Sequence, residues 1–230
     1  MARVCMIAPV RECTVEHEHA WLAGLAGRFL VFDGPDGSGK STQLTRFGAA
    51  VRAAGVPLTE VREPGGTAVG ERIREILLDP IHDEMTLRAE MMLYMASRSQ
   101  LVEETIRPAL AKGHLVVADR FVSSTFAYQG SAGGLPEHEI VAVAKAACGD
   151  TWPDLVLIFD VDGKTAASRL SPTLDRIEQR SAAYHQKVRE GYLGLARKDP
   201  DRHVVIDACA TEDGVTRAMM DALRTRLAAR

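Results

Sequence analysis

A glycine-rich stretch near the start of the chain carries residues that could hold phosphate groups. Residues 34–41 read G-P-D-G-S-G-K-S and match the pattern G-x-x-x-x-G-K-[S/T] in full. The glycines allow backbone N–H groups to converge on an anion, and a helix that begins here adds partial positive charge. The lysine can reach the β- and γ-phosphates of a nucleotide, and the serine after it can ligate Mg²⁺.

The segments around this stretch distinguish a working phosphate loop from a chance match. An apolar run at residues 29–33 predicts a buried strand directly before it, and residues 40–54 predict a helix directly after it. A glycine-rich turn without a ligand would not need this context. The residues predicted to bind a nucleoside triphosphate are Gly34, Pro35, Asp36, Gly37, Ser38, Gly39, Lys40, Ser41 and Thr42.

The rest of the chain alternates between short apolar runs and amphipathic stretches. Strands are expected over residues 29–33, 58–62, 114–119, 155–160 and 203–207, and helices over residues 40–54, 68–78, 84–112, 137–148, 174–197 and 212–229. Strands that are apolar almost throughout belong to a sheet that is buried on both faces. We therefore expect an α/β domain of the three-layer phosphate-loop NTPase fold, with a five-stranded parallel sheet and helices on both faces.

Composition limits the classes of protein that this chain could belong to. Its 230 residues include 28 Lys and Arg against 31 Asp and Glu, a formal net charge of −3, which argues against a nucleic-acid-binding surface. No apolar run reaches the roughly 18 residues of a membrane span. Four scattered cysteines form no disulfide framework, so a cytoplasmic location is expected. Residues 28–230 are expected to form the domain, and residues 1–27 a flexible extension.

Charged residues follow the predicted strands at the edge where open α/β sheets bind their ligands. The motif R-E-P-G-G-T begins at Arg62, Asp119 and Arg120 close the third strand, and L-D-R-I-E-Q begins at residue 174. Asp160 and Asp207 also end strands, but an aspartate there often only caps a turn, and we interpret both as structural. The N-K-x-D motif that reads the base in GTP-specific switches is absent from the sequence.

Three motifs together resemble bacterial thymidylate kinases. They are R-E-P-G-G-T at residues 62–67, D-R-F-V-S-S-T-F-A-Y-Q-G at residues 119–130 and L-D-R-I-E at residues 174–178. The resemblance runs from residue 28 to the end of the chain. It implies transfer of the γ-phosphoryl group of ATP to dTMP with Mg²⁺, giving dTDP and ADP for dTTP synthesis. It also implies a homodimer and a short mobile lid.

The acceptor of such a reaction is already an ionised phosphate. Catalysis then needs positioning and neutralisation of charge rather than a general base. Arg62, Arg98 and Arg120 are predicted to supply guanidinium groups to the monophosphate. Lys40 is predicted to serve the triphosphate. The expected metal ligands are Ser41 and Asp119.

The resemblance implies that the lid supplies the catalytic arginine, because family members that use an arginine of the phosphate loop have one there and this loop has none. Arg176 is the first candidate and Arg169 the second. Between residues 162 and 175 only Lys164 and Arg169 are basic, and bacterial relatives often have a longer, arginine-rich lid. The resemblance also implies that Asp36 contacts the sugar 3′-hydroxyl of the monophosphate or the shell of the metal ion.

A pocket for thymine is predicted from two helical positions and the second motif. Tyr94 is expected to stack on the base, and Arg98, four residues later on the same helical face, to hydrogen-bond a thymine carbonyl. Thr125 and Gln129 are expected to read the remaining polar edge of the base, and Tyr128 to crowd the sugar 2′ position. The residues interpreted as core are Met91, Met92 and Met95.

Two alternatives remain open on the sequence alone. One is another small nucleoside or nucleotide kinase, acting on UMP, CMP or a deoxynucleoside. The other is a nucleotide-binding regulator that keeps the fold and has lost its chemistry, which the short lid and the N-terminal extension would fit. Release of ADP that depends on an acceptor separates the kinases from the regulator.

Overall fold

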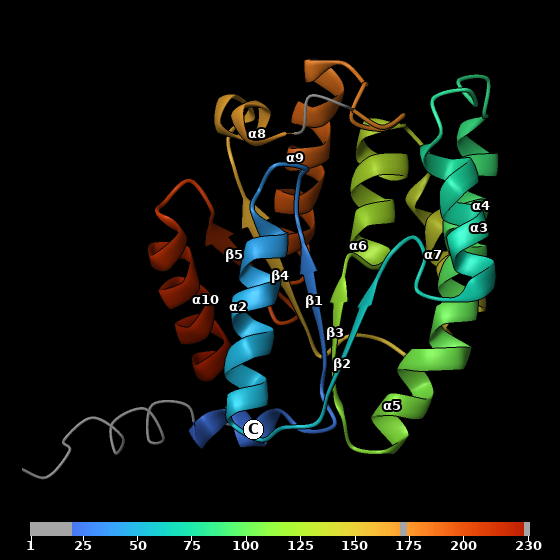
Figure 1. Ribbon diagram of the computed structural model, residues 1–230. Coiled ribbons are helices and arrows are strands. Elements are labelled where there is room, and N and C mark those ends of the chain that lie inside the picture. Colours follow the sequence, from blue (N-terminus) through green and yellow to red (C-terminus); the bar gives the residue numbers. More distant parts are fainter. Residues whose placement is uncertain (1–19, 171–173, 228–230) are drawn as a thin grey trace, which may run out of the picture.

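A parallel sheet of five strands lies at the centre of the computed structural model, which describes residues 20–170 and 174–227 (Figure 1). The strands are β1 Phe29–Asp33, β2 Leu58–Arg62, β3 Leu115–Asp119, β4 Leu155–Asp160 and β5 His203–Asp207, in the order β2-β3-β1-β4-β5. All five predicted strands are confirmed within one residue. Because every pairing is parallel, the carboxyl ends of all the strands meet at one edge of the sheet.

Helices cover both faces of this sheet, because alternate strand residues point to opposite sides. Phe29 and Val31 of β1 pack in one buried cluster, and Leu30 and Phe32 pack in another. The helices are η1 Ala20–Leu25, α2 Lys40–Ala53, α3 Ala68–Leu78, α4 Leu87–Leu101, η2 Val102–Ile106, α5 Arg107–Ala111, α6 Val122–Thr125, η3 Phe126–Ala132, α7 Glu137–Cys148, α8 Gly163–Arg169, α9 Ala182–Lys198 and α10 Glu212–Leu227. Residues from η1, α2 and α10 join the cluster of Leu30, and residues from α4, α7, η3 and α9 join that of Phe29, which confirms the three-layer prediction.

The helix predicted over residues 174–197 begins eight residues later than expected. Asp175 explains the difference, because its Oδ1 accepts hydrogen bonds from the backbone N–H groups of Ile177 and Glu178 at 2.8 and 2.9 Å. This turn competes with a helix. Ser181 then starts α9 by accepting a hydrogen bond from the N–H of Tyr184. The motif L-D-R-I-E is therefore a turn before the helix and not its first turn.

The long helix predicted over residues 84–112 is divided in three. It begins after Thr86, whose side chain caps α4, and it widens into a π-helical turn at η2 before α5. Pro108 lies in α5 and has no N–H to donate to the preceding turn, which accounts for the local widening. Met92 lies on the outer side of α4 and is 53% exposed, so its interpretation as core is wrong, whereas Met91 and Met95 are buried.

Two short helices directly after β3 were not predicted. Residues 122–132 form α6 and the π-helical turn η3, although Ser, Thr and β-branched residues give this segment a weak helix propensity. Ser123 and Ser124 anchor its start, because their hydroxyls donate to the two carboxylate oxygens of Asp33 at 2.8 and 2.7 Å. Tertiary contacts therefore decide the conformation here.

Packing of the core begins before residue 28. Leu22 and Leu25 of η1 are fully buried against the cluster that contains Leu30 and Phe32. Burial of two leucine side chains stabilises the fold by about 1.5–3 kcal/mol each. The predicted extension therefore overlaps the packed domain from Ala20 onward, and residues 1–19 lie outside the part that the structure describes.

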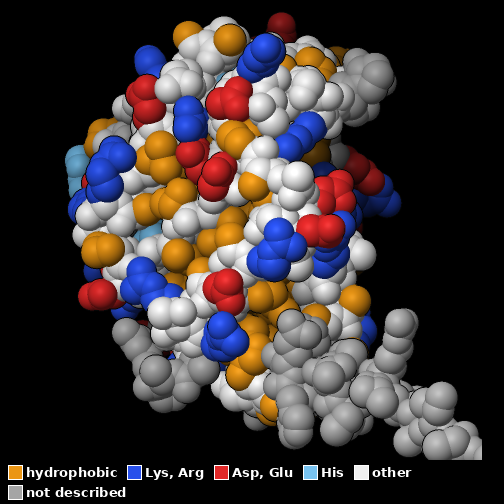
Figure 2. Space-filling view, turned by 90° about the vertical axis from the view of Figure 1, so that its left-hand side faces the viewer, with side chains coloured by type: hydrophobic (Ala, Val, Ile, Leu, Met, Phe, Trp, Pro, Cys, Tyr) orange, Lys and Arg blue, Asp and Glu red, His pale blue; other side chains and the backbone are white. Residues whose placement is uncertain are grey.

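The two aspartates interpreted as structural, Asp160 and Asp207, both contact other residues of the protein. Asp160 forms an ion pair with Arg189 of α9 at 2.6 Å, and Asp207 accepts a hydrogen bond from the N–H of Cys209, as expected of structural residues. No helix in the described part of the chain is long and apolar enough to cross a membrane. The side of the molecule where α10 lies carries hydrophobic, basic and acidic side chains intermixed, without a continuous basic field (Figure 2).

Candidate active site

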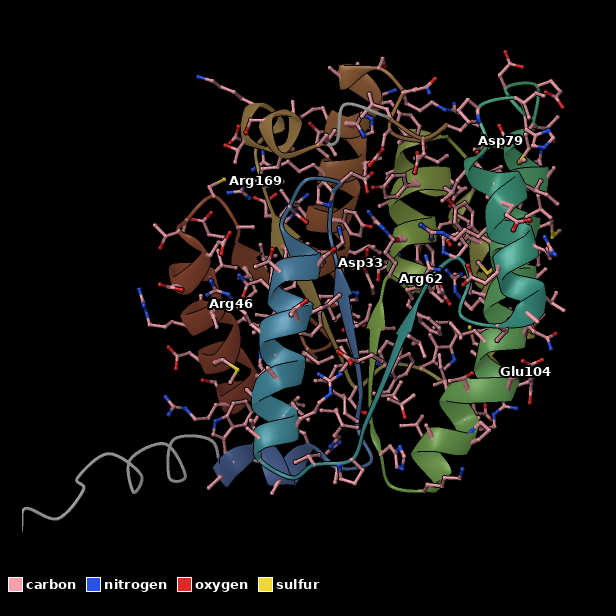
Figure 3. All side chains as sticks on the ribbon, viewed as in Figure 1. Asp33, Arg46, Arg62, Asp79, Glu104 and Arg169 are labelled. Atoms are coloured by element: carbon pink, nitrogen blue, oxygen red, sulfur yellow. The ribbon has the colours of Figure 1, made fainter. Side chains whose placement is uncertain are left out.

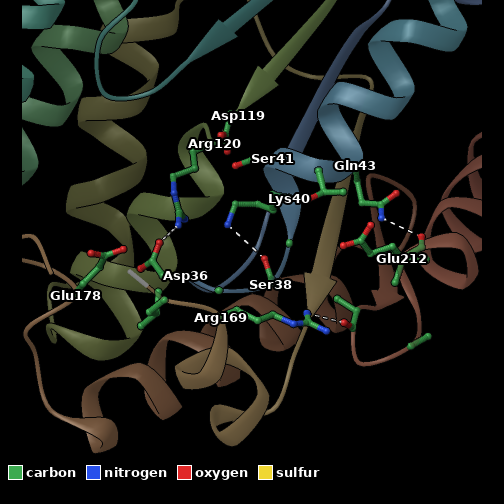
Figure 4. Close-up of a pocket in the computed structure, with 17 residues that line it drawn as sticks. Asp36, Ser38, Lys40, Ser41, Gln43, Asp119, Arg120, Arg169, Glu178 and Glu212 are labelled. Atoms are coloured by element: carbon green, nitrogen blue, oxygen red, sulfur yellow. Dashed lines mark hydrogen bonds and ion pairs between the residues drawn. The ribbon is translucent and has the colours of Figure 1, made fainter. Parts of the chain in front are cut away.

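The carboxyl edge of the sheet opens into a cavity of about 520 Å³ around the glycine-rich loop. We call it the loop cavity. Its lining residues are Asp36, Gly37, Ser38, Gly39, Lys40, Ser41, Thr42, Gln43, Asp119, Arg120, Arg169, Leu170, Glu178, Ala208, Ala210, Glu212 and Val215 (Figure 4). Seven of the nine residues predicted to bind the triphosphate line this cavity. Gly34 and Pro35 do not, but their carbonyl oxygens both accept hydrogen bonds from Lys40.

Glycines give the loop its path between β1 and α2. Gly39 precedes α2 with φ of 81°, a left-handed conformation that glycine adopts without strain. At Gly34, where φ is 137°, a Cβ atom would lie 2.5 Å from the carbonyl oxygen of Phe159 in β4. The loop therefore passes directly over the neighbouring strand, and the first N–H groups of α2 are presented to the cavity.

Lys40 is held in the loop with little exposure. Its Nζ donates to the carbonyl oxygens of Gly34 and Pro35 at 3.0 Å each and to Oγ of Ser38 at 3.4 Å. Burial, and next the nearby charge of Arg120, lower the pKa of Lys40 to about 8, although neighbouring aspartates oppose the shift. Anionic phosphates in the cavity would favour the charged ammonium.

Asp36, Arg120 and Tyr128 form a tight cluster at one end of the loop cavity. Arg120 makes an ion pair with Oδ1 of Asp36, and the hydroxyl of Tyr128 donates to Oδ2 at 2.7 Å. Burial alone would raise the pKa of the Asp36 carboxyl, but Arg120 and Lys40 hold it below its usual value. Asp36 therefore stays ionised within the phosphate loop, between the cations of Arg120 and Lys40.

The backbone and side chain of Arg120 are both fixed. Its φ of 71° is unusual for a residue with a side chain, and its N–H donates to the carbonyl oxygen of Phe32 at 3.0 Å. The guanidinium donates to the hydroxyls of Ser124 and Tyr192, each at 3.1 Å, and Tyr192 in turn donates to Asp33 at 2.5 Å. Asp33 thus holds Tyr192 and Ser124, which in turn hold Arg120, although Asp33 itself does not line the loop cavity.

Two residues of the loop cavity fit a magnesium ion. Ser41 offers a hydroxyl at the start of α2, and Oδ1 of Asp119 is buried with no hydrogen-bond partner among the described residues. Within the same residues, no three His, Cys, Asp or Glu side chains gather as a complete metal site. This donor set suits Mg²⁺, which is held by one or two carboxylates together with substrate phosphates.

A second, smaller cavity of about 190 Å³ adjoins the first. We call it the acceptor cavity. Its lining residues are Asp36, Glu63, Pro64, Arg74, Leu78, Tyr94, Arg120, Ser124, Thr125, Tyr128, Gln129, Asp175, Ile177 and Glu178. Tyr94, Thr125, Tyr128 and Gln129 are thus brought together as the sequence predicted. Asp36, Arg120 and Glu178 line both cavities, so one ligand in each would meet at these three side chains.

Arg62 and Arg98, which were predicted to bind the monophosphate, line neither cavity. Arg62 is half-exposed at the end of β2 (Figure 3). It pairs with Glu71 at 2.8 Å. Arg98 is 1% exposed beneath the acceptor cavity, where its Nε and Nη2 donate to Glu63 at 2.5 to 3.0 Å. Its remaining nitrogen, Nη1, donates to Oγ1 of Thr125 at 3.2 Å. Acidic partners that are distant in the sequence hold both guanidinium groups.

The two lid candidates occupy different places. Arg169, at the end of α8, lines the loop cavity, and its Nη1 donates to the carbonyl oxygen of Ala208 at 3.0 Å (Figure 4). Arg176 lines neither cavity and is 5% exposed. Its Nη2 donates to Glu90 at 2.6 Å and its Nε donates to the carbonyl oxygen of Leu77 at 2.8 Å.

Sequence reasoning missed several charged residues around these cavities. Arg74 lines the acceptor cavity from α3, Glu63 contributes from the loop after β2, and Glu178 lies between the two cavities. Glu63 belongs to the motif R-E-P-G-G-T and Glu178 to the motif L-D-R-I-E, so the sequence did carry a signal for both. Glu90 had a different signal, because it lies eight residues before Arg98 on the buried face of α4, and a charged residue there is rarely unpaired.

Comparison with known proteins agrees with this geometry. The family model described as thymidylate kinase matches residues 32–218. A thymidylate kinase of Pelotomaculum thermopropionicum is 44% identical over 191 residues, covering 82% of this chain and 88% of that protein. One from an Exiguobacterium species is 42% identical over 205 residues, covering 88% and 97%. One from Deinococcus radiodurans is 44% identical over 191 residues, covering 81% and 91%. The chain therefore belongs to the thymidylate kinase family.

Proposed function

We propose that this protein phosphorylates dTMP to dTDP with ATP as the donor. The observation that carries the proposal is the pair of adjoining cavities, because a phosphate loop lines one, a base-sized pocket forms the other, and Asp36, Arg120 and Glu178 belong to both. A γ-phosphate in the loop cavity would then face the phosphate of a nucleotide in the acceptor cavity. Membership of the thymidylate kinase family supports dTMP as that nucleotide.

The chemistry asks the protein to hold two anions together. Lys40 and the N–H groups at the start of α2 would neutralise the triphosphate, and Arg120 would lie between the two phosphate groups. The opposite end of the loop cavity, at Ala208, Ala210 and Val215, leaves room for the nucleoside of ATP. No side chain needs to remove a proton, because the attacking oxygen is already ionised.

A magnesium ion, when bound, would offset the negative charge of the phosphate groups. Ser41 and Asp119 are the residues that would hold it, directly or through water. The buried, unpartnered Oδ1 of Asp119 supports this assignment.

Arg169 is the better of the two candidates for a catalytic lid arginine. It lies in the loop cavity, where charge develops during transfer, and its only hydrogen bond within the described residues is to a backbone carbonyl. Two guanidinium nitrogens of Arg176 donate to Glu90 and to the end of α3, and the third, Nη1, is buried with no partner among the described residues. We therefore assign Arg169 to the transferring phosphoryl group and regard Arg176 as a residue that positions the segment after the lid.

The acceptor cavity supports selection of a thymine base. Tyr94 offers a ring for stacking, Tyr128 would crowd a ribose 2′-hydroxyl, and Thr125 and Gln129 offer polar groups to the base edge. Because Arg98 is held by Glu63, we propose that it acts on the base mainly through Thr125. Loss of the 5-methyl group removes only a small apolar contact, about 1–3 kcal/mol at most. We therefore expect dUMP to be a poor substrate and dCMP to be nearly inert.

A coupled assay of ADP release tests this function. ATP and Mg²⁺ are supplied with dTMP, dUMP, dCMP, UMP or CMP at equal concentrations, and a reaction without acceptor serves as the control. The proposal requires dTMP to give the highest kcat/KM. A higher kcat/KM for UMP or CMP would assign the chain a different nucleotide, and ADP release that ignores the acceptor would refute the kinase assignment.

We also propose that the protein forms a homodimer through the outer surfaces of α3 and α4. Five large hydrophobic side chains are exposed in the described chain, and Val69 and Ile76 of α3, Met92 of α4 and Ile81 between the helices are four of them. Such a concentration is typical of an interface. Light scattering should report a dimer that Met92→Glu weakens. The control Val205→Glu, at the exposed fifth position on β5, should leave the dimer intact, and a monomeric wild type contradicts the proposal.

A further inference from the structure

Glu90 is a buried carboxylate with no place yet in the proposed function. Its side chain is 0% exposed, and it lines neither cavity. Arg176 donates to Oε2 of Glu90 at 2.6 Å, Arg180 lies 3.6 Å from the same oxygen, and Nε2 of Gln129 donates to Oε1 at 2.8 Å. A charge so deeply buried must be paired, and here two cations and one amide do so.

The contact between Glu90 and Gln129 fixes which atom of the amide faces the acceptor cavity. A carboxylate can only accept hydrogen bonds, so Gln129 must turn its NH₂ group toward Glu90. The opposite orientation would bring two acceptor oxygens together at hydrogen-bond distance. Gln129 is 2% exposed and forms part of the cavity wall, and no described residue donates a hydrogen bond to its Oε1. This oxygen is therefore left as an acceptor for a ligand.

Thr125, one helical turn before Gln129, has its polarity fixed in a similar way. Its Oγ1 accepts a hydrogen bond from Nη1 of Arg98 at 3.2 Å, and Arg98 is held in place by Glu63. An arginine can only donate, so the hydroxyl proton of Thr125 is free to point elsewhere. The cavity wall thus offers one donor, from Thr125 at the end of α6, and one acceptor, from Gln129 one turn later in η3.

A donor beside an acceptor matches one class of pyrimidine and opposes the other. The N3–H group and the adjacent carbonyl of a thymine or uracil base present a donor and an acceptor. A cytosine presents an acceptor at N3 and an amine beside it, so its pattern is reversed. An unmatched pair of buried polar groups discriminates far more strongly than a missing methyl group does.

We propose that Glu90 is a positioning residue that sets the hydrogen-bond polarity of Gln129 and so makes the acceptor cavity select bases with an N3–H group. This inference rests on the proposed function, because it assumes that a pyrimidine monophosphate occupies the acceptor cavity. Glu90 acts without touching the substrate, through the orientation of one amide.

The isosteric substitution Glu90→Gln reverses the polarity without removing volume. The oxygen of the new amide stays with Arg176 and Arg180, which can only donate, and its NH₂ group then faces Gln129. Gln129 answers by turning its own oxygen toward position 90, which directs its NH₂ group into the acceptor cavity. The cavity then offers a donor where cytosine has its N3 acceptor.

The test compares kcat/KM for dCMP with kcat/KM for dTMP in matched variants. Glu90→Gln should raise the dCMP to dTMP ratio at least tenfold, while the KM for ATP stays unchanged. Glu90→Asp, which keeps a carboxylate, should keep the wild-type ratio. In a Gln129→Leu background, Glu90→Gln should have no further effect on the ratio, because the amide that transmits it is absent. An equal effect in that background would overturn the proposal, since the change would then come from a loosened cavity.

The outcomes separate this inference from the proposed function. Wild-type protein that fails to phosphorylate dTMP refutes the function itself. Wild-type activity together with an unchanged ratio in folded Glu90→Gln refutes only the role of Glu90. If Glu90→Gln does not fold, as judged by circular dichroism, Gln129→Leu takes its place, because it leaves the pair of Glu90 and Arg176 intact. An unchanged ratio in Gln129→Leu overturns the proposal, since Gln129 is the route from Glu90 to the base.

Discussion

Arg169 and Arg176 are expected to respond to alanine substitution in opposite ways. Arg169 is exposed, so its loss should change the free energy of unfolding by no more than about 0.5 kcal/mol. If it stabilises charge on the transferring phosphoryl group, kcat should fall by roughly 10²- to 10³-fold, as when one donor is removed from an oxyanion site. The KM values for ATP and dTMP should change little, because the effect belongs to the transition state.

Arg176→Ala should instead act on stability. The substitution removes the nearest cation from the fully buried carboxylate of Glu90. The remaining partners of that carboxylate are the amide of Gln129 and the guanidinium of Arg180, which lies 3.6 Å away. Breaking a buried pair by removal of one partner is strongly destabilising, and with Arg180 still present we expect the lower end of the range, about 3 kcal/mol. For a domain of this size, that corresponds to a fall in melting temperature of about 6–12 °C.

The assay combines thermal denaturation with steady-state kinetics on both variants. Arg180→Ala serves as the matched control, because Arg180 also approaches Glu90 but is 38% exposed and should contribute less. An Arg176→Ala protein that melts like the wild type and loses kcat at constant KM would refute the reasoning and return the catalytic role to Arg176. A full kcat in Arg169→Ala would refute the assignment of Arg169.

The pKa of Lys40 is lowered to about 8 in the free protein, and phosphate binding needs the charged ammonium, so kcat/KM for ATP should fall as the pH rises through about 8. The decline in kcat should appear at higher pH, because bound phosphates keep the ammonium charged. Coincident pH profiles of kcat and kcat/KM would contradict this role of Lys40. Tyr94→Ala should weaken the binding of dTMP by about 1–3 kcal/mol, which would raise the KM for dTMP. A change confined to the KM for ATP would refute the stacking role. Deletion of residues 2–26 removes Leu22 and Leu25 from the core and should lower the melting temperature. Deletion of residues 2–19 removes no described core residue and serves as the control. Equal melting temperatures for the two deletion variants would show that η1 adds nothing to stability.

The strands and the phosphate loop could be predicted from the sequence because their signals are local. A strand buried on both faces is apolar in almost every residue, and β1 is buried throughout. The loop match was specific because a strand and a helix flank it. The weaker predictions were those in which one element depends on another. The two short helices of residues 122–132 were not predicted, because Asp33, about ninety residues earlier in the chain, fixes their start.

The positions of the arginines could not be predicted for a related reason. Sequence shows how many guanidinium groups lie near the motifs, but not which carboxylate each one meets. Arg62 meets Glu71 and Arg98 meets Glu63, and neither pair has a distinctive spacing. Arg120 lay where expected because it directly follows a strand, so the backbone places it at the ligand edge without the help of a partner.

Two buried networks connect the chain after residue 174 to the substrate cavities. One runs from Arg176 through Glu90 to Gln129 at the acceptor cavity, and the other runs from Tyr192 of α9 to Arg120 and Asp33 below the phosphate loop. Buried polar networks hold their members in one arrangement, because each unsatisfied group inside a protein is costly. The turn that begins at Asp175 and the helix α9 are thus fixed to the residues that would hold the base and to the cation that would lie between the phosphates. A substitution in either network should therefore change how the monophosphate is positioned even where it touches no ligand.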